Sequence, residues 1–152
     1  KNGAKISASS INKELLNELK KEINFTTVNP ENLFKTNCDI LSPCALGKAI
    51  NTKNRNHLKC AAIVGAANNQ LDNTETAKWL FNNKIVYSPD YLVNSGGVIA
   101  IAAEINKTES LMDQHLNKIS DRLVSVLLES KENNIPTDFV AKRIALERIN
   151  NS

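Results

Sequence analysis

The sequence predicts an α/β fold built around a mainly parallel sheet. Short apolar runs of strand length alternate with segments in which apolar residues recur at helical spacing. Parallel neighbours require a crossover connection, usually a helix, and the helices then cover both faces of the sheet. The 152 residues are 41% hydrophobic and 23% charged, which is enough apolar material for one core. This composition excludes a disordered chain, a collagen-like fibre and a disulfide-stapled miniprotein.

The strands are predicted from apolar or β-branched runs that end at turn residues. The first strand follows Gly3 and covers 4–10, and a brief β-branched run at 25–28 ends at Asn29-Pro30. Three further strands are predicted at 38–41, 61–64 and 85–87, where Ser42-Pro43, Gly65 and Ser88-Pro89 stop them.

The helices are predicted from capping residues and from apolar residues three or four positions apart. Asn12 is expected to cap a helix whose apolar face carries Leu15, Leu16, Leu19 and Ile23. Pro30 is expected at the first position of a short helical turn. The remaining helices are predicted at 74–81, 98–105, 116–128 and 137–149.

The candidate site lies in the segments that directly follow strands, because ligands of parallel sheets bind at the carboxyl ends of the strands. These segments are 10–12, 42–47, 65–70 and 89–97. Asn68-Asn69-Gln70 places three carboxamides in succession, and a carboxamide offers both donor and acceptor to a primary amide or a sugar hydroxyl. The alternative is a polar loop that caps the next helix. Gly96-Gly97 either exposes N–H groups at the positive end of an apolar helix or is a plain helix-start turn.

The reactive and charged residues give no sign of a metal or of nucleic acid. The three cysteines, Cys38, Cys44 and Cys60, lack the paired short spacings of a zinc site, and Cys38 and Cys60 are interpreted as buried, reduced thiols of a cytoplasmic protein. His57 and His115 stand alone and are interpreted as surface histidines. The net charge of +3 comes without a basic cluster, so no nucleic acid partner is expected. No apolar run has membrane-spanning length, so no membrane partner is expected either.

Three motifs together resemble a known family. They are Cys-Asp-Ile-Leu-Ser-Pro-Cys-Ala-Leu-Gly at 38–47, Gly-Ala-Ala-Asn-Asn-Gln-Leu at 65–71 and Tyr-Ser-Pro-Asp-Tyr-Leu-Val-Asn-Ser-Gly-Gly-Val at 87–98. In order and spacing they are similar to the nucleotide-binding domain of the glutamate/leucine/phenylalanine/valine dehydrogenases, most of all the leucine dehydrogenases. The tail at 136–149 is also similar to the end of that family.

The resemblance implies a Rossmann-like, doubly wound, mainly parallel sheet that lacks its first strand and Gly-rich turn and ends in C-terminal helices. Residues 1–135 would form a partial dinucleotide-binding domain with its following helices, and 136–152 a helix that returns to a catalytic domain. The absent strand would lie between the strands at 4–10 and 38–41 and would leave two sheet edges beside a gap. The chain is therefore expected to be a piece of a longer protein.

Members of this family oxidatively deaminate an L-amino acid to a 2-oxo acid and reduce NAD or NADP. The resemblance places Ser10 and Ile11 beside the adenine ribose, and Cys44 and Ala45 along the cofactor path. It also places Asn68, Asn69 and Asn94 around the nicotinamide, with Asn69 reaching the amino end of the substrate. Val98 and Ile101 would form a branched apolar wall for a leucine- or valine-like side chain. A homo-oligomer is expected.

Two departures from the family pattern limit what the chain is expected to do. The lysines and the aspartate that act on the substrate belong to the family's other domain, so no catalytic residue is expected here and the chain alone is expected to be inactive. Ser10 stands where an acidic residue usually receives the ribose hydroxyls, and Ser9, Asn12 and Lys13 nearby could accept a phosphate. NADP is therefore expected as an alternative to NAD. The competing interpretations are a degenerate dinucleotide-binding module without activity and a self-assembling protein.

Overall fold

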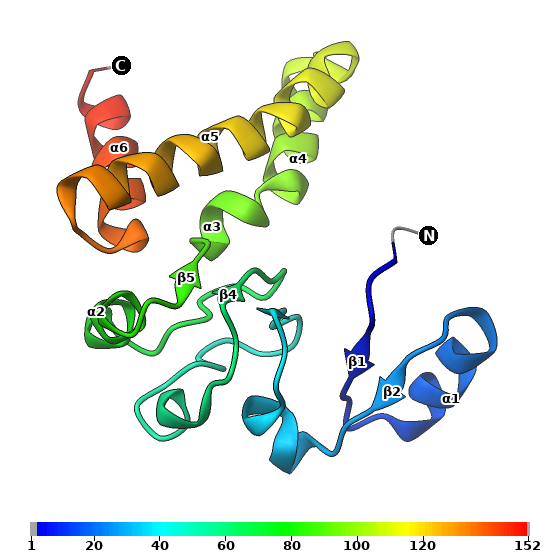
Figure 1. The fold of residues 1–152 in the computed structure, drawn as a ribbon. Helices are drawn as coiled ribbons and strands as arrows, with labels where there is room; N and C mark the ends of the chain where they lie inside the picture. The colour runs from blue at the N-terminus through cyan, green and yellow to red at the C-terminus, as the bar shows by residue number, and fades with distance from the viewer. Residues whose placement is uncertain (1–2, 152) are drawn as a thin grey trace.

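The structure, a computed structural model, describes residues 3–151 as two small parallel sheets followed by a helical segment (Figure 1). The predicted unit boundaries at 1 and 152 lie outside the described residues. The strands are β1 (Ser7–Ala8), β2 (Thr26–Thr27), β3 (Ile40–Leu41), β4 (Ala62–Ile63) and β5 (Val86–Tyr87). Each lies inside a predicted run but is shorter than predicted.

The sheet topology agrees with a Rossmann-like fold that lacks its central first strand. The strand β1 pairs in parallel with β2, and the strands β3, β4 and β5 pair in parallel in that order. No strand pairing joins β1 to β3 within 3–151. The predicted fold class is confirmed. The break in strand pairing within 3–151 falls between β1 and β3, where the absent strand was predicted.

The predicted helices are all present. They are α1 (Lys13–Glu22), α2 (Thr74–Asn82), α4 (Gly96–Asn106), α5 (Met112–Asn133) and α6 (Thr137–Asn150). The predicted cap of α1 is confirmed, because the Leu15 N–H donates to Oδ1 of Asn12 at 3.0 Å. The Gly96-Gly97 pair forms the first positions of α4 instead of preceding it. Sequence patterns indicated the short helix η1 (Pro30–Lys35) but not α3 (Asp90–Val93), η2 (Arg55–His57) or η3 (Glu109–Leu111).

The core has two parts. The larger surrounds the three-stranded sheet and consists of Leu41, Ile50, Ile63, Leu80, Ile85 and Tyr87. The smaller lies between α5 and α6 and consists of Val126, Val140 and Ala141. By contrast, the β1–α1–β2 unit lies beside the sheet and buries only Leu16 of its large apolar residues (Figure 1). The candidate site is therefore held by the three-stranded sheet and its core.

The cysteines are all unpaired thiols. Cys38 and Cys60 are half-buried and not fully buried as predicted, and Cys44 is exposed. Burial, followed by the charge of Cys38, raises the pKa of Cys60 to about 11, so this thiol is protonated at neutral pH. Within 3–151 no cluster of His, Cys, Asp and Glu side chains could hold a metal ion. None of the helices in the same range is long and apolar enough to cross a membrane.

Candidate functional site

The loops that follow β3 and β4 lie directly against each other. The Ala67 N–H donates to the Pro43 carbonyl at 2.9 Å, and the Lys48 N–H donates to the Asn69 carbonyl at 2.6 Å. A parallel bridge between Ile50 and Leu71 continues this contact. The two segments that the sequence predicted as separate candidates thus form one surface at the carboxyl end of the sheet.

Two glycines permit this close approach. A Cβ atom at Gly65 would lie 2.2 Å from the Pro43 carbonyl oxygen, and one at Gly47 would lie 2.9 Å from the Asn68 carbonyl oxygen. Both contacts are with backbone atoms, which cannot rotate away as a side chain can. Gly47 and Gly65 therefore admit the neighbouring loop.

The segment after β5 completes the surface through two side chains. The Nδ2 of Asn94 donates to Oδ1 of Asn68 at 2.7 Å and to the Ala66 carbonyl at 3.3 Å. The Asn69 N–H donates to Oδ2 of Asp90 at 2.5 Å. Asn68, Asn69 and Asn94, which were predicted as neighbours from two motifs of the sequence, are therefore brought together.

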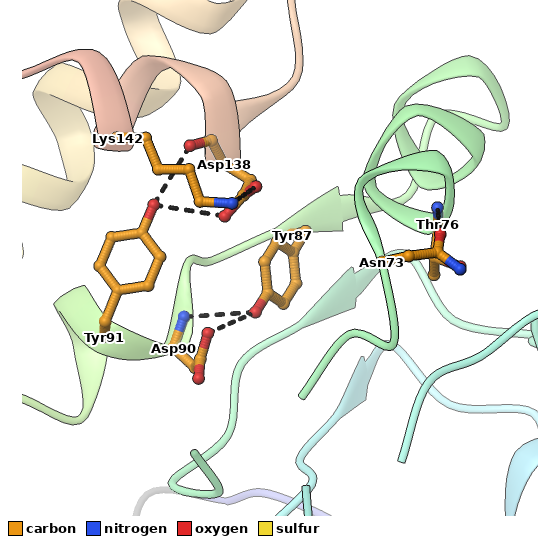
Figure 2. Close-up of polar contacts among 7 residues, drawn as sticks. All are labelled: Asn73, Thr76, Tyr87, Asp90, Tyr91, Asp138 and Lys142. Atoms are coloured by element: carbon orange, nitrogen blue, oxygen red, sulfur yellow. Dashed lines mark hydrogen bonds and ion pairs between the residues drawn. The ribbon is translucent and has the colours of Figure 1, made fainter. Parts of the chain in front are cut away.

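The Asp90 carboxylate is buried beneath this surface. Its Oδ1 accepts a hydrogen bond of 2.8 Å from the Tyr87 hydroxyl, as Figure 2 shows. Burial, and then the hydrogen bond to Asp90, raise the pKa of the Tyr87 hydroxyl, which stays protonated as the donor. Sequence reasoning missed both residues as parts of the site. The available signal was an acidic residue between Pro89 and an apolar stretch, where an unpaired charge would be costly to bury.

The three consecutive carboxamides divide into two roles. Gln70 is fully buried, and its Nε2 donates to the carbonyls of Gly65 and Ala67 at 2.8 and 2.9 Å. It therefore supports its own loop and does not cap the next helix, α2, whose cap is Asn73. Asn68 and Asn69 are exposed, and the Asn69 carboxamide makes no hydrogen bond within 3–151. Asn69 thus presents a free donor and a free acceptor.

The other predicted site residues make no hydrogen bond to these asparagines within 3–151. Cys44 and Ala45 are exposed on the loop after β3, and the Cys44 sulfur lies 3.4 Å from the Ser42 hydroxyl. Ile11 is 94% exposed, and the Ser10 hydroxyl accepts from the Asn12 N–H at 3.1 Å. Val98 and Ile101 lie one turn apart on α4 and are 71% and 59% exposed.

A cavity of about 840 Å³ lies away from this surface, between α2, β5, α5 and α6. Its lining includes Phe81, Val86, Leu127 and Pro136. None of the predicted site residues lines it. The candidate site is consequently an open surface at the strand ends and not this cavity.

Comparisons with known proteins agree with the geometry. The profile of the glutamate/leucine/phenylalanine/valine dehydrogenase family matches residues 3–151. The chain is 38% identical over 150 residues to leucine dehydrogenase from Thermoactinomyces intermedius. The matched region covers 97% of this chain and 40% of that protein. It is 36% identical over 150 residues to L-tryptophan dehydrogenase from Nostoc punctiforme, with 97% and 42% covered.

Solved structures show the same fold. The crystal structure of L-tryptophan dehydrogenase from Nostoc punctiforme matches with a TM-score of 0.91 and 34% identity, over 97% of this chain and 44% of that one. A glutamate dehydrogenase from Thermus thermophilus matches with a TM-score of 0.66 at 20% identity, over 89% of this chain and 34% of that one, which shows the fold alone.

The fold and the loops at its strand ends define a Rossmann-like α/β protein. The chain belongs to the glutamate/leucine/phenylalanine/valine dehydrogenase family, as its three motifs predicted. It spans about 40% of the length of the curated relatives it matches.

Proposed function

We propose that this chain is the cofactor-binding portion of an amino-acid dehydrogenase. The reaction converts an L-amino acid, water and an oxidised nicotinamide dinucleotide to a 2-oxo acid, ammonium, the reduced dinucleotide and a proton. The cofactor supplies the hydride acceptor. The observation that carries the proposal is the exposed, unbonded carboxamide of Asn69, which lies next to Asn68 and Asn94 in a chain of this family.

The Asn69 carboxamide fits the nicotinamide end of the cofactor. A primary amide has one acceptor and two donors, and a second primary amide can complement both kinds. Asn68 is already held by Asn94, which leaves its own Nδ2 free toward the same surface. Pyrophosphate binding is not assigned to any described residue, because the Gly-rich turn that the family uses for it is not found in the sequence.

We propose that the substrate is a branched aliphatic amino acid, on the evidence of the exposed pair Val98 and Ile101. Their side chains lie one turn apart on α4 and offer apolar surface. A substrate with a carboxylate side chain would need a cationic partner, and neither residue can supply one. The full-length gene product that contains this chain is therefore expected to reduce a nicotinamide cofactor with leucine or valine but not with glutamate.

The variant Ile101→Ala is expected to lower kcat/KM for leucine by about tenfold, because one truncated contact in an apolar pocket is worth about 1–3 kcal/mol. The measurement is steady-state cofactor reduction in the full-length gene product. Ile105→Ala is the matched control, since Ile105 lies one turn further along α4 and is 75% exposed. Equal losses in the two variants, or none in either, would contradict the assignment of the wall. Absence of any amino-acid-dependent reduction by the unmutated product would overturn the function itself.

We propose NADP as an alternative cofactor, because Ser10 carries no charge to repel a 2′-phosphate. Within 3–151 its hydroxyl accepts a local bond from the Asn12 N–H and donates none, so its own proton is available to a ligand. Ser10→Asp is expected to lower the ratio of kcat/KM for NADP to that for NAD by about tenfold or more, because like charges in contact cost several kcal/mol. A ratio that does not change would show that Ser10 lies away from the ribose.

The interpretation as a self-assembling or degenerate module has one observation in its favour. The strands β1 and β3 each pair on one side only within the described range, and unpaired edges promote association. The mass of the full-length gene product in solution, measured together with its activity, separates the proposals. An active homo-oligomer is expected, whereas an assembly without cofactor binding would favour the module.

A further inference from the structure

We propose that Asp90 is the positioning residue of this site, which holds Asn69 in the conformation that presents its carboxamide to the ligand. The proposal rests on the proposed function, because it names the group that orients a residue of that site. Neither the family motifs nor the sequence patterns gave Asp90 a role.

Both oxygens of the Asp90 carboxylate accept hydrogen bonds from other residues of the chain. Asp90 is only 8% exposed, and its Oδ2 and Oδ1 accept from the Asn69 N–H and the Tyr87 hydroxyl at 2.5 and 2.8 Å. The Asp90 N–H also reaches the Tyr87 hydroxyl oxygen at 3.3 Å (Figure 2). Hydrogen bonds to an ionised acceptor are about twice as strong as neutral ones. The contact to Asn69 is therefore a strong restraint and not a chance approach.

The restraint acts on a residue with an unusual backbone. Asn69 has φ of 52°, in the left-handed region that asparagine tolerates better than most residues. Asp90 holds the peptide on the amino side of Asn69, and the Lys48 N–H holds the carbonyl on the other side. With both peptides fixed, the Cα–Cβ bond of Asn69 has one direction, and the residue that carries the unbonded carboxamide is exposed.

The position of Asp90 is in turn fixed by contacts to α6. The Thr137 hydroxyl donates to the Tyr87 carbonyl at 2.5 Å, and the Tyr91 hydroxyl donates to Oδ1 and the carbonyl of Asp138. These contacts place the two aromatic residues on either side of Asp90 against the start of α6 (Figure 2). Because these contacts to α6 hold the residues around Asp90, the Asp90 carboxylate can keep the Asn69 N–H in one position. Asp90 thus acts through Asn69 and is not expected to touch the reacting atoms.

The competing explanation is that Asp90 serves stability alone, as a buried hydrogen-bond acceptor at the start of α3. A double-mutant cycle separates the two, because a residue that acts through Asn69 has nothing to orient once the carboxamide is gone. Asn69→Gly is the suitable partner change, since glycine adopts positive φ without strain. The variants Asp90→Ala and Asp90→Asn are made in the full-length gene product, each with and without Asn69→Gly.

Asp90→Ala is expected to lower kcat/KM by about tenfold or more in the presence of Asn69, the scale of one lost hydrogen bond to a charged group. In the Asn69→Gly background the same change is expected to lower kcat/KM less than about twofold, although it lowers Tm in both backgrounds. Asp90→Asn should restore most of the activity, because its Oδ1 can accept from the Asn69 N–H while its amide donates to the Tyr87 hydroxyl oxygen. Equal losses in kcat/KM in both backgrounds would overturn the proposal.

Hydrogen exchange of the Asn69 backbone N–H, measured by NMR, tests its hydrogen bond to Asp90 independently of the catalysed reaction. Slow exchange in the unmutated product and in Asp90→Asn, with fast exchange in Asp90→Ala, supports the proposal, and slow exchange in all three overturns it. If the unmutated product is inactive with every amino acid, the proposed function fails and the exchange result alone decides the role of Asp90. If Asp90→Ala does not fold, Asp90→Ser takes its place, because its shorter side chain fits the space without reaching the Asn69 N–H.

Discussion

Gly65→Ala is expected to destabilise the protein by about 3 kcal/mol or more, at the upper end of what overpacking a close contact costs. The added Cβ would lie 2.2 Å from the Pro43 carbonyl oxygen and 2.6 Å from the Pro43 nitrogen. That carbonyl also accepts from the Ala67 N–H, so relief of the clash would break the contact that joins the two loops. Urea denaturation measures the change in free energy of unfolding.

The same substitution at Gly97 is the matched control. A Cβ at Gly97 has no heavy atom within 4 Å, and the residue lies in the first turn of α4, where alanine is favoured over glycine by about 0.5–1 kcal/mol. Gly97→Ala is therefore expected to leave stability unchanged or to raise it. A Gly65→Ala protein as stable as the unmutated one would show that the loops after β3 and β4 can separate without loss.

Strong periodicity and turn residues made most of the fold predictable. Asn12 and Pro30 mark the starts of helical segments, and both features hold in the structure. The positions of the strands were predicted, but their ends were not. The paired length is set by the neighbouring strand and not by the length of the apolar run itself. The division of the chain at 135 and 136 remains a prediction, and α6 begins beside it at Thr137.

The sequence predicted the site residues whose side chains point outward, but not the residue whose side chain supports another residue of the site. Asn68 and Asn94 were recognised from their motifs, and the 2.7 Å hydrogen bond between them joins two of those motifs. Asp90 was missed because its partners are a backbone N–H at Asn69 and a hydroxyl at Tyr87, and neither contact leaves a periodic pattern. Short elements such as α3, with four residues, are likewise too brief for helical spacing to reveal.

Ile63→Ala is expected to lower the free energy of unfolding by about 2–5 kcal/mol, the range for removing a large aliphatic side chain from a packed core. Ile63 is fully buried on β4, the central strand of the three-stranded sheet, where it lies between Leu41 and Tyr87. Neighbouring strands on both sides limit how far the sheet can collapse into the space left behind. Ile63→Val should cost only about 0.5–1.5 kcal/mol, since it removes one methylene group.

Ile40→Ala on β3 is the matched comparison for Ile63→Ala. Ile40 is the same residue type on the adjacent strand, but it is 60% exposed and its strand pairs only with β4 within 3–151. Surface substitutions of this kind usually change stability by less than about 0.5 kcal/mol. A loss of that size in the full-length gene product would mean that the face of β3 that carries Ile40 stays exposed there. A loss near that of Ile63→Ala would mean that this face is covered in the full-length gene product, because only a covered side chain leaves a cavity when it is truncated.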